Sequence, residues 1–144
     1  MRIKLKHTEE GDGDSGTAAL RRVLLIDDET DVTESLTMNL EATGEFEVLA
    51  TNDPRQALAV AREFEPNVIV LDVVMPGMDG GDVQAALRAD PNLKEIPIVM
   101  VTALVSNNDA AGGAVETGGV HMLAKPVRLE TLLPLLRAPE EEGV

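Results

Sequence analysis

Five polar side chains of types that bind cations or handle phosphate follow apolar runs in this sequence of 144 residues: Asp27, Asp28, Asp72, Thr102 and Lys125. Three carboxylates close together repel one another and resist ionisation unless a cation lies among them. Oxygen ligands without histidine or cysteine favour a hard divalent cation, and small Mg2+ takes only one or two direct carboxylates. The residues therefore predict a Mg2+ site, provided that the fold brings them together.

The apolar runs before these side chains have the length of strands buried on both faces. We expect strands over 23–27, 46–51, 67–72, 96–103 and 120–126, and helices after Asp28 to near Gly44, from Asp53-Pro54, from Asp79-Gly80, within 107–119 and over about 129–136. Such alternation predicts an α/β fold, a doubly wound parallel sheet of five strands with helices on both faces in three layers.

Two of the expected helices contain poor helix formers. Gly112 and Gly113 inside the fourth helix each cost roughly 1 kcal/mol relative to alanine, so we expect that helix to be short, frayed or mobile. Pro134 lacks the amide that would bond to Glu130, and it should kink the fifth helix or delay its start.

Parallel sheets of this kind place their sites at the carboxyl ends of the strands. With the strand order 2-1-3-4-5, the five polar side chains would share one crevice. The cation would prime Asp72 to attack phosphorus, while the Thr102 hydroxyl and the Lys125 ammonium would neutralise phosphoryl oxygens. Each residue also has a structural explanation: Asp27 and Asp28 are favourable near a helix N-terminus, and Asp72 is a common turn former. Their joint placement favours the functional explanation.

The composition excludes several classes of protein. Twelve basic and 26 acidic residues give a net charge of -14, which disfavours binding to nucleic acid and anionic lipid. Cysteine is absent, and no apolar run reaches the length of a signal peptide core or a membrane span, so we expect a cytoplasmic protein without membrane insertion. We predict a mobile tail over 1–20, one domain over 21–138 and an acidic tail over 139–144.

The motifs LLIDDE, VLDVVMPGMDG, VMVTA and AKP, in this order, resemble the receiver domains of two-component response regulators over about residues 22–137. The resemblance implies the flavodoxin-like (βα)5 fold with strand order 2-1-3-4-5 and Asp72 as phosphoacceptor. It also implies that Asp28 and Asp72 bind Mg2+ through their side chains, Val74 through its backbone carbonyl and Asp27 largely through water.

The resemblance further implies that Thr102 and Lys125 contact the phosphoryl group and that the Lys125-Pro126 peptide is cis. One position departs from the family, because Met122 stands where a switch Tyr or Phe is usual. We therefore expect a different switch, in which the fourth helix moves and alters the face that it forms with the fifth strand and fifth helix. His121 is expected to be a solvated strand residue.

The expected function is a signalling switch that takes a phosphoryl group from the phosphohistidine of a histidine kinase or histidine phosphotransfer protein. It would not be a conventional enzyme, since it catalyses only its own phosphorylation and dephosphorylation. The apolar side chains of Val74 and Leu104 should slow the dephosphorylation, because they flank the approach of water to the phosphoryl group. The alternatives are a phosphorylation-independent interaction module and a phosphohydrolase with an aspartate nucleophile. The seven residues after Arg137 are too few for an effector domain, so we expect output through a protein contact, a phosphorelay step or a further domain. The cognate kinase, the target and the oligomeric state stay open.

Overall fold

A six-stranded sheet forms the centre of the computed structural model, which describes residues 19–103, 115–117 and 120–137. The strand order is β2-β1-β3-β4-β6-β5. The strands are β1 (Arg21–Ile26), β2 (Phe46–Thr51), β3 (Val68–Asp72), β4 (Ile98–Thr102), β5 (Val115–Thr117) and β6 (Val120–Ala124). Every pairing is parallel except that of β5 with β6. The predicted order of the five parallel strands is confirmed, with β6 as the fifth.

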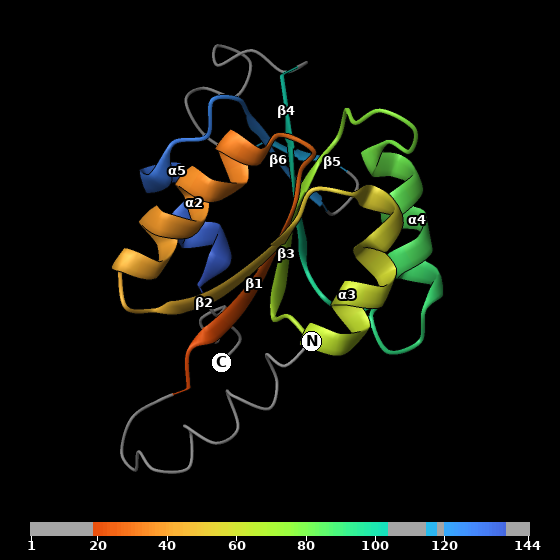
Figure 1. The fold of residues 1–144 in the computed structure, drawn as a ribbon, viewed down its shortest axis with the longest axis horizontal. Helices are drawn as coiled ribbons and strands as arrows, with labels where there is room; N and C mark the ends of the chain where they lie inside the picture. Colours follow the sequence, from red (N-terminus) through yellow and green to blue (C-terminus); the bar gives the residue numbers. More distant parts are fainter. Residues whose placement is uncertain (1–18, 104–114, 118–119, 138–144) are drawn as a thin grey trace.

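Helices cover both faces of this sheet, as predicted. They are α2 (Thr30–Ala42), α3 (Ala57–Phe64) with the 3-10 turn η1 (Pro54–Gln56) before it, α4 (Gly80–Ala89) and α5 (Leu129–Leu136). Helices α2 and α5 lie on one side of the sheet, and α3 and α4 lie on the other (Figure 1). Among the described residues, no helix is long and apolar enough to cross a membrane.

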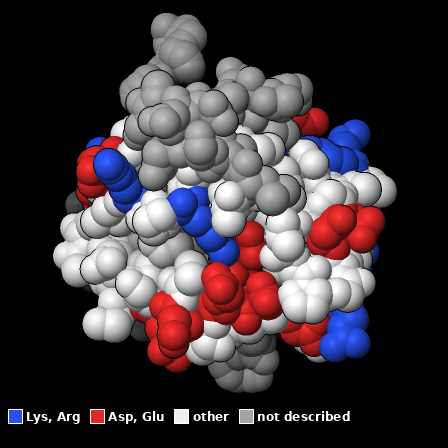
Figure 2. All heavy atoms as spheres, turned by 90° about the horizontal axis from the view of Figure 1, so that it is seen from above, with Lys and Arg blue, Asp and Glu red and all other residues white. Residues whose placement is uncertain are grey.

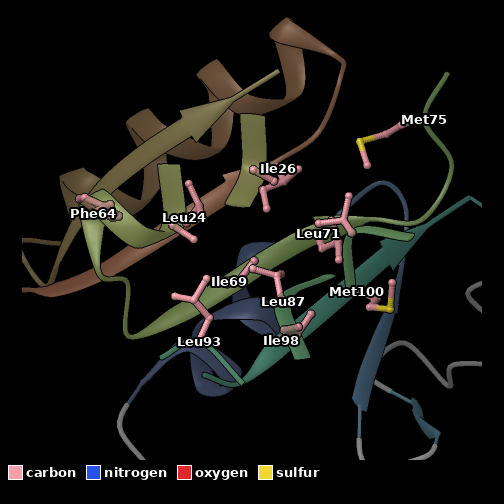
Figure 3. Packing of buried hydrophobic residues seen from close by; sticks show 13 residues of the cluster. Leu24, Ile26, Phe64, Ile69, Leu71, Met75, Leu87, Leu93, Ile98 and Met100 are labelled. Carbon is pink, nitrogen blue, oxygen red and sulfur yellow. The ribbon is translucent and has the colours of Figure 1, made fainter. Parts of the chain in front are cut away.

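Strand β1 shows why the central strands are apolar without interruption. Leu24 and Ile26 belong to the core beneath α3 and α4, part of which is drawn in Figure 3. Val23 and Leu25 point the other way and pack in the core beneath α2 and α5. Because successive side chains of a strand point to opposite faces, a strand covered on both sides must be apolar at every position.

Side-chain caps begin two of the helices where the sequence predicts. The Asp53 carboxylate accepts a hydrogen bond from the Arg55 amide before η1, and the Asp79 carboxylate accepts one from the Asp82 amide at the start of α4. Helix α5 begins at Leu129 and contains Pro134, so the proline does not delay its start.

The prediction of a fourth helix within 107–119 is wrong for part of that range. Residues Val115–Thr117 form the edge strand β5, antiparallel to β6, and the rest of the predicted range, 107–114 and 118–119, lies outside the described residues. Valine and threonine favour the extended conformation, and pairing with β6 supplies backbone hydrogen bonds that an isolated, glycine-weakened helix would have to form alone. Most of the tail over 1–20, which was expected to be mobile, lies outside the described residues, as do residues 107–114 of that helix and the acidic tail over 139–144.

Candidate functional site

The register of the sheet brings the five predicted side chains to one edge. The pairing of β1 with β3 places Asp27 beside Asp72, at the point where both strands end. The pairings of β3 with β4 and of β4 with β6 place Thr102 and Lys125 at the same edge, and the Lys125 amide donates to the Thr102 carbonyl over 3.0 Å. Thr102 itself is buried. The sequence prediction that these side chains share one crevice agrees with this register.

Three carboxyl groups form an acidic cluster in this crevice. Carboxylate oxygens of Asp27, Asp28 and Asp72 all lie within 4.8 Å of one another. Asp27 and Asp72 are buried, with 6% and 3% of their surface exposed, whereas Asp28 is half-buried. Figure 2 shows acidic side chains gathered beside a basic one near the middle of this end of the molecule. A cluster of oxygen donors with one side open to solvent fits a hard cation that keeps part of its water, as Mg2+ does.

The ammonium of Lys125 lies against this cluster. Its Nζ is 3.1 Å from Asp27 Oδ2, 3.5 Å from Asp72 Oδ1 and 3.1 Å from Glu29 Oε1. The lysine side chain is 18% exposed, so these ion pairs are only partly screened by solvent. The lysine therefore offsets part of the negative charge of the pocket.

The offset is incomplete at Asp72. Burial raises the pKa of this carboxyl group, and the charge of Asp27 raises it further. Lys125 and the Val74 backbone amide act in the opposite direction, and the resulting pKa is about 6. The raised pKa means that the ionised form of Asp72 is destabilised here and that a further cation nearby would stabilise it.

Asn52 supports the site from the end of β2, a role that the sequence analysis missed. Its side-chain amide donates to the Asp27 carbonyl over 2.8 Å and to the Thr33 hydroxyl over 3.0 Å. It thereby joins the loop after β1 to the first turns of α2. The signal in the sequence was a polar amide directly after an edge strand, which is too common to identify this role. Glu29, which reaches Lys125, was also missed.

The remaining predicted positions lie in the loop after β3, in β6 and in the turn that follows β6, except Leu104. Val74, in the loop after β3, is 55% exposed. The Lys125-Pro126 peptide is cis, as the resemblance implied. Met122 and His121 both lie in β6, as expected for His121, and both are half-buried. Leu104 lies outside the described residues.

The family model of the response regulator receiver domain matches residues 23–137, a range that contains the whole site. The chain belongs to this family. Membership makes it a receiver of two-component signalling with a flavodoxin-like fold, and receivers of this family bind Mg2+ at an acidic pocket and work with histidine kinases. This receiver has an acidic cluster, formed by Asp27, Asp28 and Asp72.

Relatives from Mycobacterium tuberculosis are similar over most of the receiver. The DNA-binding response regulator MtrA is 37% identical over 118 residues, which cover 82% of this chain and 50% of MtrA. The transcriptional regulatory protein PrrA is 40% identical over 117 residues, which cover 81% of this chain and 48% of PrrA. The chain therefore spans about half the length of these two relatives.

A solved structure is also similar to this chain. The chemotaxis protein CheY4 of Vibrio cholerae superposes with a TM-score of 0.69 at 33% identity, over 82% of this chain and 97% of that one.

Proposed function

We propose that this receiver is a phosphoacceptor switch that takes a phosphoryl group onto Asp72 from the phosphohistidine of a histidine kinase or histidine phosphotransfer protein. The observation that supports this most is the position of Asp72. It is buried at the end of a central strand, within 4.8 Å of the other two carboxylates and 3.5 Å from the Lys125 ammonium. A purely structural aspartate would not need two acids and a lysine around it.

In the proposed reaction a carboxylate oxygen of Asp72 attacks phosphorus. A new P–O bond forms while the P–N bond to the donor imidazole breaks, and its electron pair stays on the imidazole nitrogen. Transfer of this kind needs mainly positioning and neutralisation of the phosphoryl oxygens. We assign the neutralisation of the phosphoryl oxygens to the Lys125 ammonium and the Thr102 hydroxyl. These groups stand at the carboxyl ends of β6 and β4, the two strands that follow β3 in the sheet.

We propose Mg2+ as the resident cation, held by the side chains of Asp28 and Asp72, by the Val74 carbonyl and, through water, by Asp27. The oxygen-only donor set of the acidic cluster fits this ion. When bound, Mg2+ supplies charge that favours the ionised form of the carboxylates and of the phosphoryl group. The chain's own contribution is to hold the three carboxylates and Lys125 in place.

The output of the switch is proposed to be a change of the face that carries β6, α5 and the segment between β4 and β5. That segment lies outside the described residues. Met122 supports a switch different from the usual aromatic one, because it is half-buried and packs against the core beneath α3 and α4. The DNA-binding role printed for MtrA belongs to that protein, and no nucleic-acid contact is proposed for this acidic chain.

Phosphorylation by a small-molecule donor tests the proposal. The protein is incubated with acetyl phosphate and Mg2+, and its intact mass is measured over time. We expect one phosphoryl group on the parent, none on Asp72→Asn and none when EDTA replaces Mg2+. The matched control is Asp79→Asn, because this nearby aspartate caps α4, asparagine also caps helices, and the variant should be modified like the parent.

The other outcomes point to the alternative functions. A folded parent that gains no phosphoryl group would refute the proposal and favour an interaction module independent of phosphorylation. Sustained release of inorganic phosphate over many turnovers, without accumulation of modified protein, would also refute it and favour a phosphohydrolase.

The side chain at position 74 is expected to control how long the phosphoryl group lasts. Val74 is exposed and belongs to the loop whose amide contacts Asp72, so it lies on the path of attacking water. An apolar side chain cannot orient that water, whereas an amide can. We predict a slow loss of phosphate from the parent and a loss faster by about tenfold in Val74→Asn, which corresponds to the upper end of what one hydrogen bond contributes. Release of phosphate from protein freed of donor measures it. A parent lifetime of only seconds, or equal rates in both proteins, would contradict this prediction.

A further inference from the structure

Among the described residues, the ammonium of Lys125 has three carboxylate partners, and one of them stands outside the acidic cluster. Besides Asp27 and Asp72, it contacts Glu29 Oε1 at 3.1 Å, as closely as it contacts Asp27. Glu29 comes from the loop between β1 and α2, and 96 residues of chain separate it from the lysine. The three partners match the three donors of an ammonium group.

The Glu29 side chain contacts Lys125 and does not cap the helix that begins after it. Glu29 is the N-cap residue of α2, a position where Asp, Asn, Ser and Thr are preferred because their short side chains bond to the helix amides. The Glu29 side chain makes no such capping bond. Its longer side chain reaches across the crevice to Lys125 instead.

Of the three partners, Glu29 is the one that can release the lysine at the lowest cost. Its side chain is 57% exposed, whereas those of Asp27 and Asp72 are 9% and 4% exposed. The other oxygen of Asp27 is held by the backbone amide of Glu29 at 2.9 Å. A carboxylate that turns into water regains hydration, but one that stays buried without its partner does not.

Glu29 also helps to keep the lysine charged. Burial alone would lower the pKa of Lys125, but hydrogen bonds to Glu29 and Asp27, together with the charges of Asp27 and Asp72, outweigh it and raise the pKa. A phosphoryl group on Asp72 would offer strong anionic acceptors to the same ammonium. The charged lysine would then have more partners than donors, and the most exposed partner should leave.

We propose that Glu29 is a positioning residue that holds the Lys125 ammonium while Asp72 is unmodified and gives it up to a phosphoryl group on Asp72. This inference rests on the proposed function, since it names a group that competes with the phosphoryl oxygens for the lysine. It also gives the start of α2 a direct response to modification, because the residue that caps this helix loses its long-range contact.

The contact predicts that loss of Glu29 favours binding of a phosphoryl mimic. Removal of a competing, partly exposed ion pair should tighten beryllofluoride binding by about three- to fivefold, towards the upper end of what such pairs contribute. Glu29→Gln removes the charge. Glu29→Asp keeps the charge but is shorter by one methylene, and its carboxylate is suited to bond to the helix amides rather than to Lys125.

The experiment titrates beryllofluoride into the whole chain at saturating Mg2+, and calorimetry measures the Kd because the chain has no Trp or Tyr to report by fluorescence. The matched control is Asp31→Asn. Asp31 lies in the first turn of α2 and lines the same groove as Lys125, but among the described side chains no ion pair joins the two. We expect both Glu29 variants to bind more tightly by the stated factor and Asp31→Asn to stay within about twofold of the parent.

A direct readout of the lysine separates a positioning role from a general effect on folding. The 15N NMR signal of the Lys125 ammonium, recorded without beryllofluoride, should shift in both Glu29 variants and not in Asp31→Asn. If Glu29→Gln behaves like Asp31→Asn, or if Glu29→Asp binds like the parent, only local charge matters and the inference is wrong. Weaker binding in either Glu29 variant also overturns it. If the parent itself fails to bind beryllofluoride at Asp72, the proposed function fails first, and that result is distinct from the others.

Discussion

Replacing Gly80 with alanine should lower the free energy of unfolding by about 3 kcal/mol, the upper part of the range for overpacking a tight site. A Cβ atom at this position would lie 2.5 Å from the carbonyl oxygen of Asp72 and 2.7 Å from the Cα of Val73. Both are backbone atoms, so no change of rotamer can make room. Either α4 or the end of β3 must move.

The same substitution should impair the site. Gly80 is the first residue of α4, and its amide donates to the Val73 carbonyl over 2.7 Å, so the helix is fastened directly to the residue after Asp72. A shift of this contact moves the main chain that carries the proposed phosphoacceptor. We therefore expect slower phosphorylation by acetyl phosphate even at temperatures where the variant is fully folded.

Gly81→Ala is the matched control for this prediction. A Cβ at Gly81 would meet the Asp79 carboxylate at 3.3 Å, and this flexible side chain needs to give by only a few tenths of an ångström, which leaves its capping bond to the Asp82 amide in place. Because alanine is the better helix former, this variant should be as stable as the parent or more stable by up to about 1 kcal/mol. Urea unfolding followed by far-ultraviolet circular dichroism measures both. Equal stabilities of the two variants would show that α4 can move away from the end of β3 at little cost, and the prediction would be wrong.

Much of the architecture could be predicted because it depends on local patterns. The run from Val23 to Ile26 is apolar at every position, which only a strand covered on both faces requires, and its alternate side chains do enter two separate cores. Asp53 and Asp79 are both followed by helix starts because short acidic side chains bond to the first amides of a helix. With the strand order 2-1-3-4-5 predicted, the polar side chains could be expected to meet at the carboxyl ends of the strands.

The features that could not be predicted depend on distances between segments far apart in the sequence. The need for glycine at position 80 arises from how closely α4 approaches β3, and the sequence indicated only the start of a helix there. Strand β5 required knowledge that β6 still had an open edge. The contact of Glu29 with Lys125 depends on side-chain reach across the crevice, which residue spacing does not encode.

Negative charges outnumber positive charges in the crevice when no cation is bound. Asp27 and Asp28 lie beside Asp72, and the single ammonium of Lys125 is divided among three carboxylates, of which Glu29 is one. Burial raises the pKa of Asp72, and the charge of Asp27 raises it further. The residues that would make phosphoryl transfer effective should therefore lower the stability of the protein without metal, and this conflict can be measured.

Asp72→Asn should stabilise the metal-free protein at pH 8. The pKa of Asp72 is raised to about 6 in the folded protein, so between about pH 4 and pH 6 the folded state binds a proton that the unfolded state has lost. The stabilising effect of that proton is complete below pH 4 and is lost as the pH rises through 6. In EDTA, we expect the variant and the parent to be similar at pH 4 and the variant to be more stable at pH 8, by on the order of 1–2 kcal/mol after solvent screening.

Saturating Mg2+ at pH 8 should reverse this order. At about a hundred times its Kd, a bound ion adds about 2.7 kcal/mol to the parent, and Asp72→Asn lacks one of the proposed ligands. Glu63→Gln removes a charge from the exposed surface of α3, near the opposite end of the sheet, and should keep the parent's response to Mg2+. Urea unfolding of the three proteins, in EDTA and in Mg2+, measures the effect. If Asp72→Asn is the less stable protein at pH 8 in EDTA, then Lys125 more than balances the carboxylates, and the electrostatic explanation of the crevice is wrong.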